Sequence, residues 1–138
     1  MKVSLAKGLL LLLMLASLLI SCTPVPASWE DATYQKDTVL GDGGTTVTVK
    51  VTADEKTVSF TLKTDEENIA DAMLAAGLCT GDREAYGLYI KYVNGIRADY
   101  ELDGGYYWQL NVDGKTAAKG ASATPVREGA VYELVRTR

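Results

Sequence analysis

The sequence predicts an α+β domain in which one short helix packs on a mostly antiparallel sheet. Three observations support this prediction. Several stretches alternate apolar with polar residues or are rich in aromatic and β-branched residues, as strands are. One stretch between them has the spacing of an amphipathic helix, and turn dipeptides separate the others. A single helix with strands before and after it in the chain is expected to lie across one sheet face, which is a β-grasp-like layout.

The domain is expected to begin near Thr45 with a hairpin. Apolar and polar residues alternate over 47–51 and again over 58–62. This period of two is typical of strands that bury one face. The residues between the two runs, 53–56, have the composition of a turn.

A short helix is predicted to follow this hairpin. Thr64 and Glu67 have the N-cap and N3 spacing of a capping box, which predicts that the helix begins after Thr64. Gly77 is expected to end the helix as its C′ residue. The apolar residues between these ends recur at the spacing of one buried helix face, and they are Ile69, Ala72, Met73 and Ala76.

The second half of the chain contains the remaining predicted strands. Asn94-Gly95 and Asp113-Gly114 are dipeptides typical of two-residue hairpin turns, and Asp103 to Gly105 predict a further turn. Glu128-Gly129 precedes the last strand. The predicted strands are 86–93, 106–112, 115–119 and 130–136.

The N-terminal 21 residues have the features of a secretory signal peptide. Lys2 and Lys7 form a basic region, an apolar run covers 9–20, and Ser21 precedes Cys22. The run is shorter than the ~20 residues that a membrane span needs. Residues 19–22 resemble the bacterial lipobox, in which the Cys thiol receives a diacylglycerol; an ordinary signal peptide with an incidental Cys is the alternative. Several acyl chains on Cys22 would anchor the mature chain stably to a bilayer.

These features predict three segments and a location. Residues 1–21 are expected to be the signal peptide, and 22–43 the lipidated Cys and a flexible tether, because the latter have a turn and linker composition without sustained periodicity. Trp29 and Tyr34 are exceptions to this composition, and their docking onto the domain is the alternative. Residues 44–138 are expected to form the domain. The predicted location is the extracytoplasmic face of a bacterial cell membrane, with the lipid bilayer as a partner through Cys22.

Composition argues against nucleic-acid binding. Removal of residues 1–21 takes Lys2 and Lys7 from the 14 basic residues and leaves 12 against 18 acidic ones, so the net charge goes from −4 to −6. An acidic surface repels phosphate backbones. If Cys22 is lipidated, Cys79 is the one remaining thiol and no internal disulfide can form. A small buried hydrophobe is the favoured interpretation of Cys79, and a reactive thiol is the alternative.

The residues for catalysis or a resident cofactor are not found in the sequence. The chain has no His, so it lacks the commonest general base and the commonest nitrogen ligand of metals. One spare Cys cannot build a thiolate zinc site, and Gly41 to Gly44 lack the spacing of a nucleotide-binding loop. Acidic pairs lie at predicted turns, where solvated charges are expected. We therefore expect a protein that is not an enzyme and requires no metal or cofactor.

Tyrosine is concentrated in one part of the chain. Six of the eight Tyr residues lie between positions 86 and 107, and Trp108 follows them. Outward-facing aromatic rings on neighbouring strands would form a platform for a small molecule, a glycan or a protein. A sheet surface that is merely rich in Tyr is the alternative, because Tyr favours strands.

Four short motifs in order resemble the C-terminal domain of transcobalamin. Residues 87–95 match a G-x-Y-x-x-x-V-x-G stretch, and 107–110 are similar to F-W-Q-L. Residues 119–121 are similar to Q-G-I, and 127–129 to K-D-G before the last strand. The resemblance covers roughly residues 45–136. It implies a β-grasp-like fold and a surface that covers one side of cobalamin, and uncharacterised bacterial lipoproteins share this pattern.

The resemblance also implies a set of ligand-binding residues, with a corrinoid as the ligand. Tyr89 and Trp108 would pack on the corrin, and groups around Gln109, Ala118 and Lys119 would hydrogen-bond its amides. A domain that covers one side of the ligand would take its second wall from a partner, such as a membrane transporter or surface protein. The alternative function is a surface module that uses the same aromatic residues to bind a protein or a glycan, with no small-molecule ligand.

Overall fold

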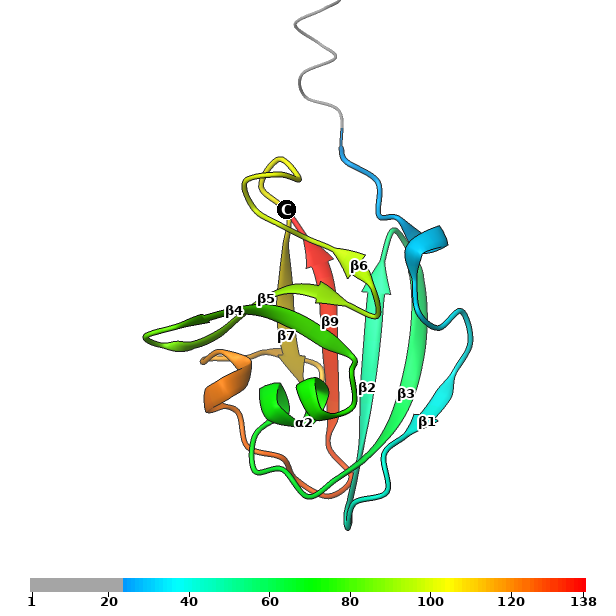
Figure 1. The fold of residues 1–138 in the computed structure, drawn as a ribbon, viewed down its shortest axis with the longest axis vertical. Helices are drawn as coiled ribbons and strands as arrows, with labels where there is room; N and C mark the ends of the chain where they lie inside the picture. The colour runs from blue at the N-terminus through cyan, green and yellow to red at the C-terminus, as the bar shows by residue number, and fades with distance from the viewer. Residues whose placement is uncertain (1–23) are drawn as a thin grey trace, which may run out of the picture.

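The computed structural model describes residues 24–138, so the predicted signal peptide and Cys22 lie outside the described residues. These residues form an α+β fold with one α-helix and two sheets, as predicted (Figure 1). No helix within residues 24–138 is long and apolar enough to cross a membrane. The elements are η1 Trp29–Asp31, β1 Thr38–Leu40, β2 Thr45–Ala53, β3 Lys56–Thr64, α2 Ile69–Ala75, β4 Cys79–Glu84, β5 Gly87–Val93, β6 Ile96–Arg97, β7 Tyr107–Val112, β8 Lys115–Thr116, η2 Ala121–Ala123 and β9 Val131–Thr137.

The larger sheet has six strands in the order β1-β3-β2-β9-β7-β8. The predicted hairpin of β2 and β3 is confirmed, and Asp54 and Glu55 at its turn both have positive φ. β2 pairs in parallel with β9, the last strand, which pairs antiparallel with β7. The inward side chains of β2, β3 and β9 alternate with outward ones and form the core together with α2. The two ends of the predicted domain are therefore neighbours at the centre of this sheet.

The smaller sheet has three strands in the order β4-β5-β6. β5 and β6 form a hairpin around Asn94-Gly95, whose φ values of 52° and 77° are those that a two-residue turn requires. The sequence analysis did not predict β4. Most of its residues are polar and exposed, so no apolar alternation marks it, and its pairing with β5 makes it a strand.

The helix begins later than the sequence predicted. Thr64 does not cap it, because Thr64 is buried as the last residue of β3 and is paired with Thr45 of β2. Asn68 is the N-cap residue, and its side-chain oxygen accepts a hydrogen bond of 2.9 Å from the Asp71 N–H. The predicted end at Gly77 is confirmed, with φ of 68° and the paired bonds of a Schellman motif: the Gly77 N–H donates to Leu74 O, and the Leu78 N–H to Met73 O.

Residues 24–37 lie against the domain, so the prediction of a flexible tether over 22–43 is wrong from residue 24 onward. The Trp29 indole N–H donates to Ala53 O at 2.8 Å, and Lys56 Nζ lies 4.6 Å from the Trp29 ring centroid. The Ala27 N–H donates to an Asp54 carboxylate oxygen at 2.6 Å. These contacts join the N-terminal segment to the turn between β2 and β3.

The segment continues along the edge of the larger sheet. Tyr34 exchanges two hydrogen bonds with the Asn94 side chain, at 2.8 and 2.9 Å, and its ring packs edge-on against Phe60. Residues 38–40 then pair in parallel with β3 as strand β1. Trp29 and Tyr34, the two exceptions to the linker-like composition, are thus the residues that dock, and distant partners supply their hydrogen bonds.

Cys79 at the start of β4 is a buried free thiol, as the favoured interpretation of the sequence predicted. Burial raises the pKa of this thiol from 9.0 to about 12, so it stays neutral at pH 8. We expect native protein to resist a maleimide at pH 8 and to react after unfolding in guanidinium. The unfolded thiol ionises first, so the contribution of Cys79 to stability is complete below pH 9 and falls as the pH rises toward 12.

A matched control for this labelling experiment is Thr80→Cys, because Thr80 is the exposed neighbour of Cys79 on the same strand. Its added thiol should react in the folded protein. Equal labelling rates for native Cys79 and the added Cys would contradict the buried state of Cys79.

Candidate functional site

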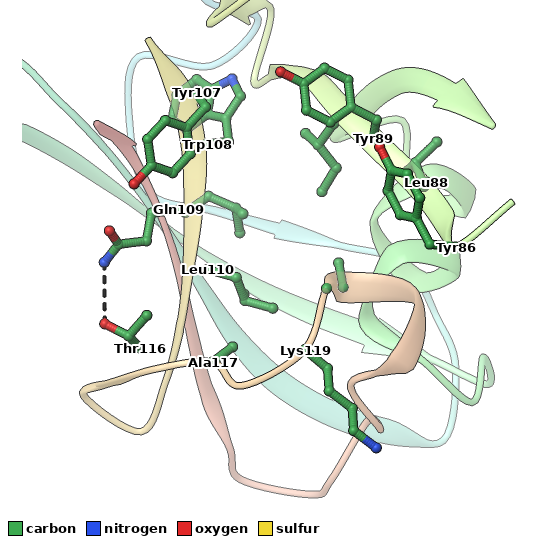
Figure 2. Close-up of a pocket in the computed structure, with 14 residues that line it drawn as sticks. Tyr86, Leu88, Tyr89, Tyr107, Trp108, Gln109, Leu110, Thr116, Ala117 and Lys119 are labelled. Carbon is green, nitrogen blue, oxygen red and sulfur yellow. Dashed lines mark hydrogen bonds between the residues drawn. The ribbon is translucent and has the colours of Figure 1, made fainter. Parts of the chain in front are cut away.

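A pocket of about 370 Å³ opens where the two sheets diverge, between β5 and β7 (Figure 2). The segment that follows β8 and leads into η2 forms its third wall. The lining is mostly aromatic and aliphatic, and it consists of Tyr86, Leu88, Tyr89, Ile90, Tyr107, Trp108, Gln109, Leu110, Thr116, Ala117, Lys119, Gly120, Ala121 and Leu134.

Trp108 joins the two sheets at this pocket. It lies on β7 with 8% of its surface exposed, and its indole N–H donates to the carbonyl of Lys91 on β5 at 3.2 Å. A buried indole N–H needs such a partner. Trp108 therefore sets the distance between β5 and β7 and presents only a small part of its ring to the pocket.

The third wall is fixed to β5 by a close contact. The Leu88 N–H donates to Ser122 Oγ at 2.9 Å, and Thr124 Oγ1 donates to Gly120 O at 2.9 Å. Gly87 has φ of 123°, and a Cβ there would lie 2.6 Å from the Cβ of Ser122. Glycine at position 87 thus permits η2 to approach β5 closely enough to close this side of the pocket.

Polar groups are few and lie at the rim. Gln109 Nε2 donates to Asn111 Oδ1 at 3.0 Å and to Thr116 Oγ1 at 3.4 Å, the second of which is drawn in Figure 2. Side chains alternate along β7, so the Gln109 amide lies on the face opposite to the pocket-facing side chains of Trp108 and Leu110 (Figure 2). Lys119 is exposed at the opposite wall. The site thus combines an apolar lining of aromatic and aliphatic side chains with polar side chains at its edges.

Four of the five ligand-binding residues predicted from the sequence lie in this one pocket: Tyr89, Trp108, Gln109 and Lys119. Ala118 does not, since it is exposed outside the pocket while its two chain neighbours line it. The resemblance also did not indicate the aliphatic floor. Leu110 and Leu134 reach it from adjacent strands, β7 and β9, and the pairing of those strands is not visible in the sequence.

A second recess adjoins the pocket and shares Tyr86 and Tyr89 with it. Its walls are more polar, and Lys91 Nζ lies 2.8 Å from Asp82 and 3.5 Å from Asp99. The hydrogen bond to Asp82 is the largest cause that raises the pKa of Lys91 above its ordinary value. Within residues 24–138, no three or more His, Cys, Asp or Glu side chains are grouped so that they could hold a metal ion.

Part of this chain is similar to a recognised domain type. Residues 66–131 match the model described as a domain of unknown function, DUF4430. No curated protein matches the chain. A solved structure from Ruminococcus gnavus ATCC 29149, whose protein is named provisionally as metal binding, matches with a TM-score of 0.63 and 26% identity. That match covers 69% of this chain and 98% of the other.

Haptocorrin, solved in complex with Cbi, has the same fold over part of its length. The TM-score is 0.57 and the identity 20% over 68% of this chain, and the match spans 25% of the haptocorrin chain. At this identity the likeness concerns the fold alone. It supports the transcobalamin-like layout that the four sequence motifs predicted.

Proposed function

We propose that this protein is a lipid-anchored, extracytoplasmic binding protein whose pocket between β5 and β7 captures a small molecule, with a corrinoid as the ligand. The observation that carries the proposal is the meeting of Tyr89, Trp108, Gln109 and Lys119 in one mostly apolar pocket. Its volume of about 370 Å³ lies within the range of roughly 300–1,000 Å³ that is typical of ligand sites.

The chemistry of the pocket suits an apolar ring system. Tyr89 and the exposed edge of Trp108 offer aromatic contact to such a ring. Haptocorrin, which shares the fold, was solved with Cbi. A metal ligand, which the name of the Ruminococcus gnavus protein would suggest, is less well supported because residues 24–138 provide no cluster of donors.

The pocket is open, so it covers one side of such a ligand and leaves the other in water. Binding that desolvates one face should be weak, with a dissociation constant on the order of micromolar. An anchor at Cys22 would offset this weakness by holding the domain near a membrane partner that supplies the second wall. The proposed activity is therefore capture and hand-over, with no chemical step.

Titration with cobalamin tests this function, using a soluble form of the chain that starts at Thr23. We expect saturable binding by calorimetry or a shift in the visible spectrum of cobalamin. Tyr89→Ala should weaken binding about tenfold, because a buried aromatic contact contributes roughly 1–1.5 kcal/mol.

The matched control is Tyr92→Ala, three positions along the same strand and outside the pocket. Tyr92 is 40% exposed, so its removal should leave affinity unchanged. No binding at high micromolar cobalamin, or equal losses in the two variants, would count against the proposed pocket.

A second candidate function is a surface module that binds a protein or a glycan. The specific observation in its favour is that Tyr86 and Tyr100 expose most of their surface beside the pocket, and Tyr107 about a third. Exposed Tyr residues are common at protein interfaces. Cross-linking on intact cells grown without corrinoid separates the two functions. Capture and hand-over expects its partner only when ligand is present, whereas this function expects a partner without ligand, lost when Tyr86 is replaced by Ala.

A further inference from the structure

The chain is held firmly only three residues beyond the proposed anchor. Arg136 Nη1 donates to Val25 O at 2.6 Å, and Arg136 is itself buried. Its Nε donates to Arg97 O at 3.0 Å, and its guanidinium lies 4.0 Å from the centre of the Tyr106 ring. Val25 is therefore tied to the end of β9 through a side chain that the core keeps in place.

The covalent geometry of the backbone then limits how far the anchor can lie from the domain. Cys22 and Val25 are separated by three Cα–Cα steps of 3.8 Å, so their Cα atoms are at most about 11 Å apart. Acyl chains on Cys22 would start within this distance of Val25. The bilayer surface would consequently lie against this end of the domain, with no long tether between them.

The loop between β6 and β7, residues 98–106, lies at this same end. In Figure 1 the loop stands beside the C-terminus and the start of the described chain. A Cβ added to Gly104 would lie 3.8 Å from a methyl carbon of Val25. The loop carries two of the most exposed apolar side chains among residues 24–138, since Leu102 is 67% and Tyr100 60% exposed.

Hydrogen bonds hold this loop in one conformation. Arg97 donates two bonds to the Asp103 carboxylate, at 3.0 and 2.9 Å, and the Asp99 N–H donates a third at 2.8 Å. Burial alone would raise the pKa of Asp103, but these bonds outweigh it and leave that pKa below its ordinary value. Asp99 accepts from the N–H groups of Glu101 and Leu102, at 3.1 Å each. These hydrogen bonds therefore hold the loop in a conformation that leaves the Leu102 side chain exposed.

Two of the three acidic side chains of the loop are paired within the domain: Asp103 with Arg97, and Asp99 with Lys91 Nζ at 3.5 Å. The third, Glu101, is exposed, so the docked loop would keep it at the level of the headgroups. The mature chain is acidic overall, so attraction to anionic headgroups does not hold this end at a membrane. Leu and Tyr side chains suit the boundary between headgroups and acyl chains, where Tyr is enriched.

We propose that loop 98–106 docks on the bilayer that holds Cys22 and inserts Leu102 and Tyr100 into its interfacial layer. This inference rests on the proposed lipidation of Cys22. The anchor and the loop would act as two membrane contacts, which fixes the orientation of the domain. The pocket would then open along the flank of the domain, with Tyr107 toward the bilayer, because Tyr107 pairs with Thr137 at the end of β9.

Depth-dependent quenching tests this docking in the full, acylated chain reconstituted into phosphatidylcholine vesicles. A Leu102→Cys variant is labelled with a nitrobenzoxadiazole dye, and the vesicles carry lipids with a spin-label quencher in the acyl chain. The matched control is Lys115→Cys, an exposed residue beyond the opposite end of β7. Cys79 is buried, and any residual dye labelling of it is measured as background with the unsubstituted chain.

We expect at least about threefold stronger quenching at position 102 than at 115, because only the first should reach the acyl region. The difference should persist in 1 M salt, since the contact is apolar. Equal quenching at the two positions in a chain whose acylation mass spectrometry has verified would overturn the docking alone. Loss of the difference in high salt would also overturn it. An unmodified Cys22 in the mature chain would overturn both the anchor and the docking.

Discussion

Trp108→Ala is expected to destabilise the domain by about 3–5 kcal/mol, the usual cost of removing a large buried aromatic side chain. Trp108 is almost fully buried between β5 and β7, and its N–H bonds to Lys91 O. Truncation would leave a cavity between the two sheets and a carbonyl without this partner. Unfolding in guanidinium, followed by circular dichroism, measures the change.

The matched control is Tyr107→Ala, the preceding residue on the same strand, which is 37% exposed. Its free energy of unfolding should change by less than about 1 kcal/mol. Similar losses in the free energy of unfolding for the two variants would contradict the conclusion that Trp108 holds the two sheets together. Trp108→Phe keeps most of the volume, so it is the suitable variant for asking whether the indole itself contributes to ligand affinity.

Gly81→Ala is expected to separate β4 from β5 and to cost about 2–4 kcal/mol, within the range of overpacking and strain. A Cβ at position 81 would lie 1.9 Å from Tyr89 O and 2.9 Å from Ile90 Cα. Both atoms belong to the backbone of β5, so neither can move without the strand. Gly81 stands where the register between β4 and β5 shifts, which is a β-bulge that brings the two backbones close.

The substitution should also weaken ligand binding, because Tyr89 lines the pocket from the strand that must move. Gly120→Ala is the matched control. Gly120 lines the same pocket but has φ of −67°, and a Cβ there would meet no atom within 4 Å. Its stability should change by less than about 0.5 kcal/mol. A Gly81→Ala protein as stable as the Gly120→Ala protein would show that β4 and β5 can separate without cost.

The position of Gly120 bears on the sequence motif that contains it. Lys119-Gly120-Ala121 resembles a Q-G-I motif. Neither the backbone conformation nor the packing requires glycine here. The glycine that the pocket does need for its third wall is Gly87, at the start of the longest motif.

Several features were predictable from the sequence because residues close in the chain determine them. The turn dipeptides Asn94-Gly95 and Asp113-Gly114 adopt positive φ as their residue types favour, and Gly77 ends the helix with a local pair of hydrogen bonds. The alternation in β2 and β3 follows from burial of one face. The α+β class could be predicted from these local patterns together.

The candidate site was predictable in part. The motifs indicated Tyr89, Trp108, Gln109 and Lys119, which do line one pocket. They could not indicate that Trp108 is mostly buried, because its exposure depends on how closely two separate sheets approach.

Other features depend on partners far away in the chain, and only the tertiary structure decides them. Strand β4 forms because β5 pairs with it. The helix begins only after Asn68, because pairing with β2 keeps the residues up to Thr64 in strand β3. Residues 24–40 have a linker's composition, yet hydrogen bonds from distant residues fasten them along the domain. The sequence by itself predicts an α+β domain behind a lipid anchor. The tertiary structure decides that the chain is held against the domain from its first described residues, because the side chain of Arg136 binds the backbone at Val25.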